Sequence, residues 1–122
     1  MSSCYPVIDN DIPFENFFKS QGEVCLLNNV PDALKSDDTN LKYFQTMDDL
    51  MFHYGIRTED IITANENNTP YLGDFVITQQ EKKYFIRIYS DIGIRDFFQN
   101  NKYATKNDNI VGIVLSCDRF LK

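Results

Sequence analysis

Alternating apolar and polar positions are clearest between Tyr71 and Tyr89, and this stretch predicts a β-hairpin. Its two arms, Phe75–Thr78 and Tyr84–Tyr89, are rich in β-branched and aromatic residues, which suit a pleated, half-buried surface. A polar connection of five residues, Gln79–Lys83, joins the arms, and this is a common hairpin loop length. Since two strands alone are marginal in water, the hairpin is expected to pack its apolar face against other elements.

The second arm of the hairpin divides into two faces, because side chains alternate along a strand. Ile86 and Ile88 share the face that we expect to point into the core. The opposite face is expected to be wetter because it contains a charged residue. It carries Phe85, Arg87 and Tyr89. Aromatic rings that flank an arginine are typical of a protein contact surface; the alternative is that these rings pack beneath a helix.

Two further runs are apolar almost throughout and have the length of strands. Val24–Leu27 and Ile110–Leu115 lack the alternation of a half-exposed strand, which indicates burial on both faces. Leu41–Gln45 is compatible with a strand or a helix. Asn65–Pro70 is rich in asparagine and is expected to be the main flexible connection.

Helical spacing of apolar residues predicts three short helices, at Phe14–Lys19, Met47–Tyr54 and Ile92–Gln99. The middle helix has the clearest start signal. Thr46 is suited to cap it, and the acidic pair that follows suits the positive end of the helix dipole. A second cap is expected at Thr58.

Together these elements predict an α+β fold for a single domain spanning residues 1–122. The expected sheet is mainly antiparallel, has about four or five strands and is built around the hairpin at residues 74–89. Three or four short helices are expected to pack on it. A chain of this length buries roughly two thirds of its unfolded surface, so it needs no metal or disulfide framework to fold.

The net charge is −6, and the charged residues are unevenly distributed along the chain. Residues 1–66 hold twelve acids and four bases, whereas residues 67–122 hold six acids and eight bases. An acidic surface repels nucleic acid and anionic membrane and attracts basic proteins. The alternative is that a net charge of this size only keeps a small protein soluble.

No apolar run approaches the length of about 20 residues that spans a membrane, and the first residues lack the pattern of a secretory signal. The three cysteines, Cys4, Cys25 and Cys117, are too few and too scattered for a disulfide framework, and none forms a C-x-x-C pair. These features predict a cytoplasmic location, no membrane partner and no zinc site.

Candidate catalytic residues are sparse. Cys25 and His53 form the one pairing that offers a thiol nucleophile and a base, but a cysteine within an apolar strand usually behaves as a small hydrophobe. Asp74, Glu81 and Lys83 have the composition of a nuclease magnesium site, although the last two fall in the predicted hairpin turn. No glycine-rich phosphate loop occurs. We therefore expect no catalytic residue, no metal ligand and no cofactor.

Three acidic pairs lie at predicted loops or helix starts between residues 37 and 60. They are Asp37 and Asp38, Asp48 and Asp49, and Glu59 and Asp60. Helix capping explains the last two pairs, but capping carboxylates still project their field into solvent. The predicted partner-binding residues are these six acids together with Phe85, Arg87 and Tyr89.

These features predict a non-enzymatic binding protein that neutralises a basic protein partner, with fast association driven by electrostatic steering. Its most concrete form is an immunity-type inhibitor of a cationic bacterial toxin such as a nuclease. One alternative is a small enzyme that uses Cys25 and His53 or a pair of carboxylates. Another is an adaptor or structural subunit of a larger assembly, suggested by the outward aromatic residues.

Overall fold

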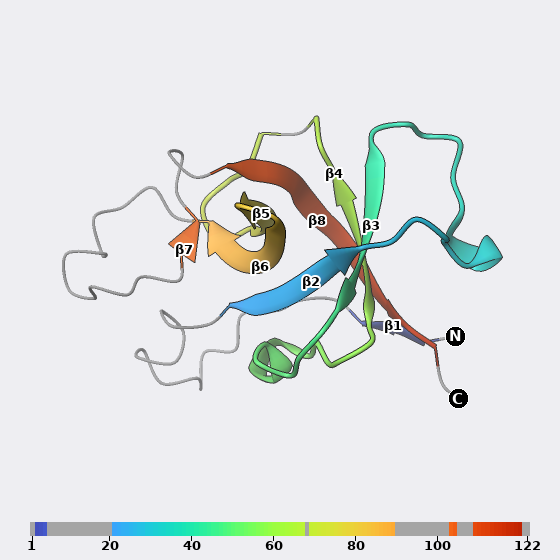
Figure 1. Ribbon diagram of the computed structural model, residues 1–122, viewed down its shortest axis with the longest axis horizontal. Coiled ribbons are helices and arrows are strands. Elements are labelled where there is room, and N and C mark those ends of the chain that lie inside the picture. The colour runs from blue at the N-terminus through green and yellow to red at the C-terminus, as the bar shows by residue number, and fades with distance from the viewer. Residues whose placement is uncertain (1, 5–20, 68, 90–102, 105–108, 121–122) are drawn as a thin grey trace.

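The computed structural model describes residues 2–4, 21–67, 69–89, 103–104 and 109–120, which form a closed antiparallel barrel (Figure 1). Among these residues, six strands make the wall. They are β2 (Gly22–Leu26), β3 (Leu41–Thr46), β4 (Ile61–Asn65), β5 (Phe75–Gln80), β6 (Lys83–Tyr89) and β8 (Ile110–Arg119). Two short strands extend the sheet. β1 (Ser2–Cys4) pairs with the end of β8, and β7 (Tyr103–Ala104) pairs in parallel with β6.

The strands follow the order β2-β3-β4-β8-β5-β6 around the barrel, and β6 pairs with β2 to close it. β2, β3 and β4 form a meander, while β5 and β6 form a hairpin. β8 inserts between these two units. Its Cys117 lies opposite Ile62 of β4, and its Gly112 lies opposite Ile77 of β5. β8 therefore joins the two units of the barrel wall.

The barrel interior is filled by apolar side chains from the inward face of each strand. Phe44, Ile62, Ile77 and Ile86 come from four different strands, and each is at most 1% exposed. Burial of one such side chain contributes about 1.5–3 kcal/mol to stability. The connection between β3 and β4 adds three more residues to this core: Met51, Tyr54 and Ile56.

Gly112 marks the point where β8 passes from its neighbour β5 to its neighbour β4. A Cβ atom at this position would lie 3.0 Å from the Cβ of Ala64 on β4. The pairing register shifts next to it, between Thr63 and Ala64 on β4 and between Ile77 and Thr78 on β5. A residue without a side chain thus allows the close approach of backbones at a bend of the wall.

The predicted hairpin is confirmed, and so is its inward face. Ile86 is fully buried and Ile88 is 2% exposed. The connection is shorter than predicted, because β5 continues to Gln80 and β6 begins at Lys83. Glu81 in the resulting tight turn has φ 58°, in the left-handed region. The two apolar runs predicted as interior strands coincide with β2, which ends at Leu26, and with part of β8, and each pairs along both edges. Their predicted burial on both faces is wrong, because one face of a barrel strand points outward: Leu26 is 40% exposed and Leu115 is 46% exposed.

The predicted α+β fold, with three or four short helices on a sheet, is wrong. In the part of the chain that the structure describes, the helical elements are two 3-10 turns of three residues, η1 (Asp32–Leu34) and η2 (Phe52–Tyr54). The predicted helices Phe14–Lys19 and Ile92–Gln99 lie outside the described residues. The predicted helix Met47–Tyr54 is a loop that retains only η2.

Long-range hydrogen bonds explain why Met47–Tyr54 is not a helix. Oδ2 of Asp48 accepts the backbone N–H of Glu23 on β2 at 3.1 Å. Oδ1 of Asp49 accepts the backbone N–H of Thr58 at 2.8 Å. The two carboxylates thus bind distant backbone groups instead of compensating the dipole of their own helix.

The two predicted caps have other roles as well. Thr46 is the last residue of β3, and its hydroxyl donates to the carbonyl oxygen of Arg57 and accepts the backbone N–H of Asp60. Thr58 lies in a turn that leads directly into β4, where a helix was expected. The β-branched residues at the start of β4 favour a strand at that point.

Candidate functional site

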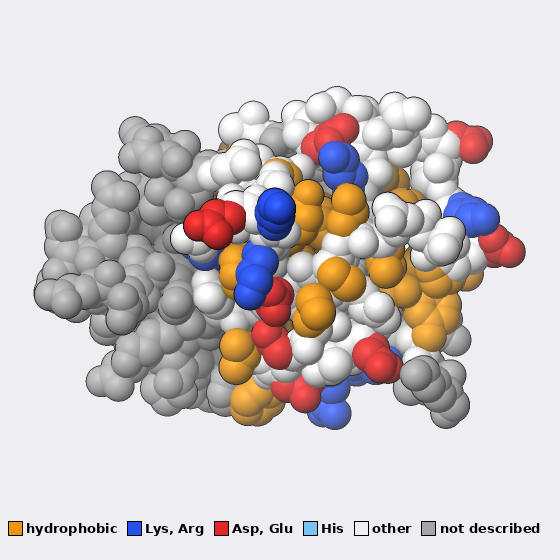
Figure 2. Space-filling model, viewed as in Figure 1, with side chains coloured by type: hydrophobic (Ala, Val, Ile, Leu, Met, Phe, Trp, Pro, Cys, Tyr) orange, Lys and Arg blue, Asp and Glu red, His pale blue; other side chains and the backbone are white. Residues whose placement is uncertain are grey.

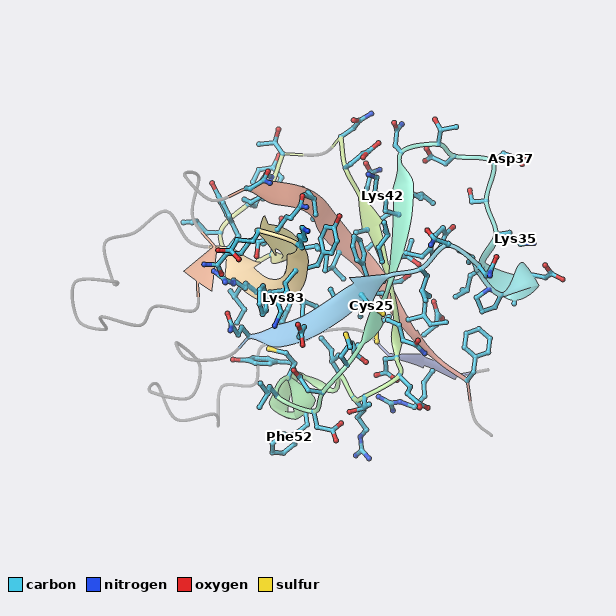
Figure 3. The ribbon with its side chains drawn as sticks, viewed as in Figure 1. Cys25, Lys35, Asp37, Lys42, Phe52 and Lys83 are labelled. Carbon is cyan, nitrogen blue, oxygen red and sulfur yellow. The ribbon has the colours of Figure 1, made fainter. Side chains whose placement is uncertain are left out.

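The structure separates the first two acidic pairs. Asp37 and Asp38 lie in the exposed loop before β3, whereas Asp48 and Asp49 follow its end. A strand of six residues is roughly 20 Å long, so the two pairs lie at opposite ends of β3. Figure 3 shows Asp37 at one edge of the molecule and Phe52 at the opposite edge. Phe52 belongs to the connection that follows β3. The six predicted acids therefore do not form one face.

Asp60 points into the protein, where it is 1% exposed. Its carboxylate forms two hydrogen bonds with the Arg119 guanidinium, each 2.8 Å long, and accepts the backbone N–H of Arg57 at 2.7 Å. Arg119 also donates to the carbonyl oxygen of Gly55. The hydrogen bond to Asp60 raises the pKa of Arg119. Asp60 thus fixes the β3–β4 connection to β8 and is not available at the surface.

The remaining acids, Asp48, Asp49 and Glu59, stay together on the connection between β3 and β4. The same connection turns three large apolar side chains toward solvent. Leu50 is 62% exposed, Phe52 is 56% exposed and Met47 is 54% exposed. We call this set the 47–59 surface; its members are Met47, Asp48, Asp49, Leu50, Phe52 and Glu59.

Buried neighbours and hydrogen bonds hold the 47–59 surface in one conformation. Met51 and Tyr54, which alternate with the exposed apolar residues, are at most 1% exposed and belong to the barrel core. Gly55 ends η2 with φ 84° and is hydrogen-bonded to Phe52. Because the loop is already ordered, a partner that binds it loses little further conformational entropy.

Apolar and acidic side chains lie beside one another at the lower edge of the face drawn in Figure 2. Phe52 in Figure 3 points away from the barrel at the same edge. Isolated exposed hydrophobic residues are normal on any protein, but a group of large ones rimmed by polar residues is typical of an interaction site. The 47–59 surface has this composition.

Asp48 and Asp49 differ in their electrostatic surroundings from the acids that form ion pairs. Elsewhere, Lys35 pairs with Asp32 at 2.9 Å, and Lys42 pairs with Glu66 at 3.4 Å. Among the described residues, Asp48 and Asp49 have no such ion pair. The hydrogen bond from the backbone of Thr58 lowers the pKa of Asp49. A hydrogen bond from the Thr58 side chain and the positive charge of Arg57 lower this pKa further. Asp49 therefore remains charged at neutral and mildly acidic pH.

The predicted hairpin residues occupy the outer face of β6, as expected. The guanidinium carbon of Arg87 lies 5.3 Å from the centre of the Phe85 ring. Phe85 is paired with Glu23 of β2, whose backbone N–H is bound by Asp48, so it neighbours the 47–59 surface. Tyr89 lies toward the other end of β6 and packs against a small outer cluster around Val76.

The residues considered for catalysis lie on separate elements. Cys25 is half-buried on β2 opposite Gln45, and His53 belongs to η2. Asp74 and Glu81 stand directly before and after β5, and a strand of six residues is too long for them to share one metal ion. In the described residues, no three side chains of His, Cys, Asp or Glu gather where they would hold a metal ion.

One cysteine forms a disulfide that the sequence pattern did not predict. Cys117 is disulfide-bonded, and the pairing of β1 with β8 sets Cys4 directly opposite it. Cys25 is a free thiol. Spacing along the sequence did not indicate this pair, because residues from the two ends of the chain meet only through strand pairing.

We expect the unfolded but unreduced protein to react with a thiol reagent at Cys25 alone, and the reduced protein to react at all three cysteines. Mass spectrometry of the alkylated chain measures both states. Three reactive thiols before reduction would contradict the disulfide.

Comparison of the chain with protein-family models, with curated proteins and with solved structures found no match. Within the described ranges, no helix has the length and apolar character needed to cross a membrane. The candidate site is therefore argued from its own geometry alone.

Sequence reasoning missed the exposed apolar residues because Met47, Leu50, Met51 and Tyr54 have the spacing of one helical face, which would bury them together. The sequence did contain one sign that some of these residues are exposed. The segment 47–54 holds two adjacent acids and several large apolar residues, and it is too short to bury all of the apolar side chains on one side. The roles of Arg119 and Asp60 gave no local signal, because these residues are 59 positions apart in the chain.

Proposed function

We propose that this chain is a non-enzymatic binding protein that neutralises a basic protein partner through the 47–59 surface. A cationic toxin domain is the most concrete form of such a partner. The observation that carries the proposal is the combination of three exposed apolar side chains with carboxylates on one ordered loop. Apolar anchors supply affinity after desolvation, and the acids speed the encounter with a basic surface.

The net charge of −6 supports the same proposal, because a basic partner is attracted over a Debye length of about 8–10 Å at physiological ionic strength. Phe85 and Arg87 on the neighbouring strand extend the contact area. Asp37 and Asp38 contribute only to the long-range field, since they lie at the far end of β3.

The compartment is part of the proposal. A cytoplasmic location was expected because the first residues lack a secretory signal and the three cysteines are too few for a disulfide framework. The second reason no longer applies to Cys117, which is disulfide-bonded. Structural disulfides persist in oxidising environments and are rare in the cytosol. We therefore propose that the folded protein meets its partner in an oxidising compartment.

The test compares two variants, each of which loses three negative charges at different positions. One variant carries Asp48→Asn, Asp49→Asn and Glu59→Gln. Each new amide keeps one acceptor oxygen, which at position 49 can accept the native bond from Thr58 and at position 48 can accept one of the two native bonds, from Glu23 or from Leu50. The matched control carries Asp32→Asn, Asp37→Asn and Asp38→Asn. A partner captured from native lysate by the wild-type protein is identified and purified, and its association rate is measured by stopped flow at low and high salt. We expect the first variant to associate about tenfold more slowly at low salt or worse, and the control to change about twofold at most.

Each outcome decides a different point. If both variants slow association equally, the total net charge determines the rate, and the 47–59 surface is not the binding site. Unchanged rates in both variants, or a captured partner that is not basic, would contradict the proposed function.

A further inference from the structure

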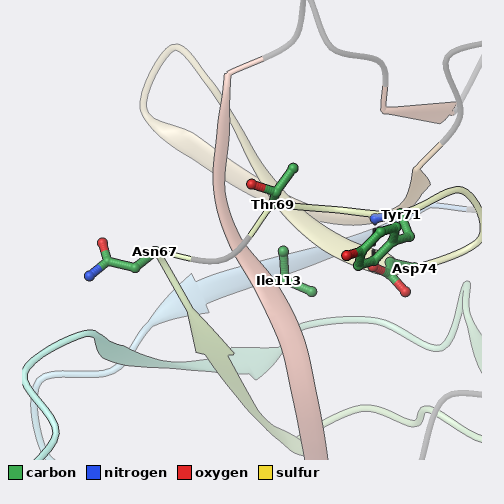
Figure 4. A pocket seen from close by; sticks show the side chains of 5 residues that line it. All are labelled: Asn67, Thr69, Tyr71, Asp74 and Ile113. Carbon is green, nitrogen blue, oxygen red and sulfur yellow. Dashed lines mark hydrogen bonds between the residues drawn. The ribbon is translucent and has the colours of Figure 1, made fainter.

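An open pocket of about 440 Å³ lies on the outside of the barrel beside β8, at the end of β4 opposite to the 47–59 surface. The described residues that line it are Asn67, Thr69, Tyr71, Asp74 and Ile113. Figure 4 shows Ile113 in the middle, Asn67 at one end and Tyr71 with Asp74 at the other. Small-molecule sites commonly have volumes of roughly 300–1,000 Å³, so the pocket is large enough for a ligand of a few rings.

A tight turn holds the backbone of Tyr71, the aromatic residue of this pocket, in place. The backbone N–H of Asp74 donates to the carbonyl oxygen of Tyr71 at 3.0 Å, and Gly73 between them has φ 90°. This is the hydrogen bond and the left-handed glycine of a type II turn. The turn is fastened to β6, because Gly73 donates to the carbonyl oxygen of Tyr89 and the N–H of Tyr89 donates to Asp74. The backbone from which the Tyr71 ring projects is therefore fixed before any ligand arrives.

The Tyr71 side chain is 77% exposed, the most exposed of the large apolar residues in the described ranges. An aromatic ring that is exposed to water loses unfavourable hydration when a flat apolar surface covers it. Ile113, which is 7% exposed, adds a small apolar floor next to it. Both features favour a ligand with at least one apolar face.

The polar groups around the pocket favour a ligand with many hydroxyl groups. Oδ2 of Asp74 accepts the N–H of Tyr71 at 2.8 Å, and among the described residues its Oδ1 accepts no hydrogen bond. The side chains of Asn67 and Thr69 are exposed and, within the same residues, make no hydrogen bond. An amide, a hydroxyl and a carboxylate oxygen offer both donors and acceptors. No lysine or arginine is among the described lining residues, which disfavours an anionic ligand.

From this arrangement we propose that the pocket binds a neutral sugar ring, whose C–H face stacks on Tyr71 while its hydroxyls bond to Asp74, Thr69 and Asn67. A pyranose has both an apolar face and several hydroxyl groups, because its ring hydrogens form the apolar face and its hydroxyls point outward from the rim. The site is independent of the 47–59 surface and of any basic partner.

The test is a titration of the ¹⁵N-labelled protein with glucose, galactose, mannose and N-acetylglucosamine, followed by amide NMR shifts. Choline and inorganic phosphate serve as cationic and anionic comparison ligands. We expect at least one sugar to shift the amides of Asn67, Thr69, Tyr71 and Asp74 with millimolar affinity. Tyr71→Ala should weaken that sugar about tenfold or more.

Leu72→Ala is the matched control, because Leu72 belongs to the same turn, is 55% exposed and does not line the pocket. It should leave sugar affinity unchanged. Both side chains are exposed, so both variants should keep the wild-type amide spectrum elsewhere, which shows that they are folded. Absence of shifts with every sugar, shifts with choline or phosphate alone, or equal loss in the two variants would overturn the assignment.

Discussion

Arg119→Leu is expected to lower the free energy of unfolding by about 3–5 kcal/mol, because it leaves the carboxylate of Asp60 charged and without its partner in the protein interior. Asp60 is 1% exposed, and both of its oxygens bind Arg119 at 2.8 Å. The Arg119 side chain is itself 30% exposed, which favours the lower end of this range. Urea unfolding monitored by circular dichroism, with linear extrapolation to water, measures the change.

The matched control is Lys35→Met, which removes the cation of an ion pair on the surface. Lys35 and Asp32 are 64% and 94% exposed, so solvent screens their attraction. A loss of about 0–1 kcal/mol is expected there. The double variant Asp60→Asn with Arg119→Leu should regain part of the loss, since no buried charge remains. Similar losses for Arg119→Leu and Lys35→Met would show that water reaches Asp60 and that the pair does not fix the β3–β4 connection.

Phe44→Ala is expected to cost about 3–5 kcal/mol of stability, because it empties a space at the centre of the barrel. Phe44 is 1% exposed and belongs to the main core cluster. Its ring centre lies 5.3 Å from that of Tyr84, across β2. Neighbouring strands are held by hydrogen bonds on both edges and can move little to fill the cavity.

Phe52→Ala makes the same chemical change on the 47–59 surface and is the control. Phe52 is 56% exposed, so its truncation should alter stability by no more than about 0.5 kcal/mol. Thermal and urea unfolding of both variants give the comparison. If the two truncations cost the same, Phe52 packs against the protein in solution and is not an exposed anchor for a partner.

The strands that could be predicted from the sequence are those with a strong local pattern. Ile86 and Ile88 alternate with polar or amphipathic neighbours, and continuous apolar runs mark β2 and β8. Such patterns depend only on the two-residue period of a strand and on which side faces the core. These patterns do not depend on which strands are neighbours, and therefore they did not reveal the order of the strands around the barrel.

The loop at residues 47–54 was mistaken for a helix because its local signals are those of a helix. Met47, Leu50, Met51 and Tyr54 have helical spacing, and Asp48 and Asp49 follow Thr46. Hydrogen bonds to residues 25 and 9 positions away determine the outcome instead. Local preference is worth a few tenths of a kcal/mol per residue, which several tertiary contacts readily exceed.

The grouping of acids that the sequence suggested is only partly kept in the structure, for a related reason. Asp48, Asp49 and Glu59 do lie on one connection, but nearness in sequence wrongly added Asp37 and Asp38, which β3 carries to its other end. Asp60 is adjacent to Glu59 in the sequence, yet its side chain faces inward, because it accepts hydrogen bonds from Arg119 of β8. Strand pairing determines where Asp37, Asp38 and Asp60 lie. The hydrophobic pattern of the sequence does not reveal which strands pair.

The position of β8 has a consequence for synthesis of the chain. The five earlier wall strands can assemble as an open sheet, whose two outermost members, β4 and β5, keep unsatisfied backbone groups until residues 110–119 leave the ribosome. Exposed edges of this kind recruit strands from other molecules. Closure joins segments that are far apart in the chain, which makes it slow compared with hairpin formation. The nascent protein therefore passes through a stage in which self-association competes with completion of the fold.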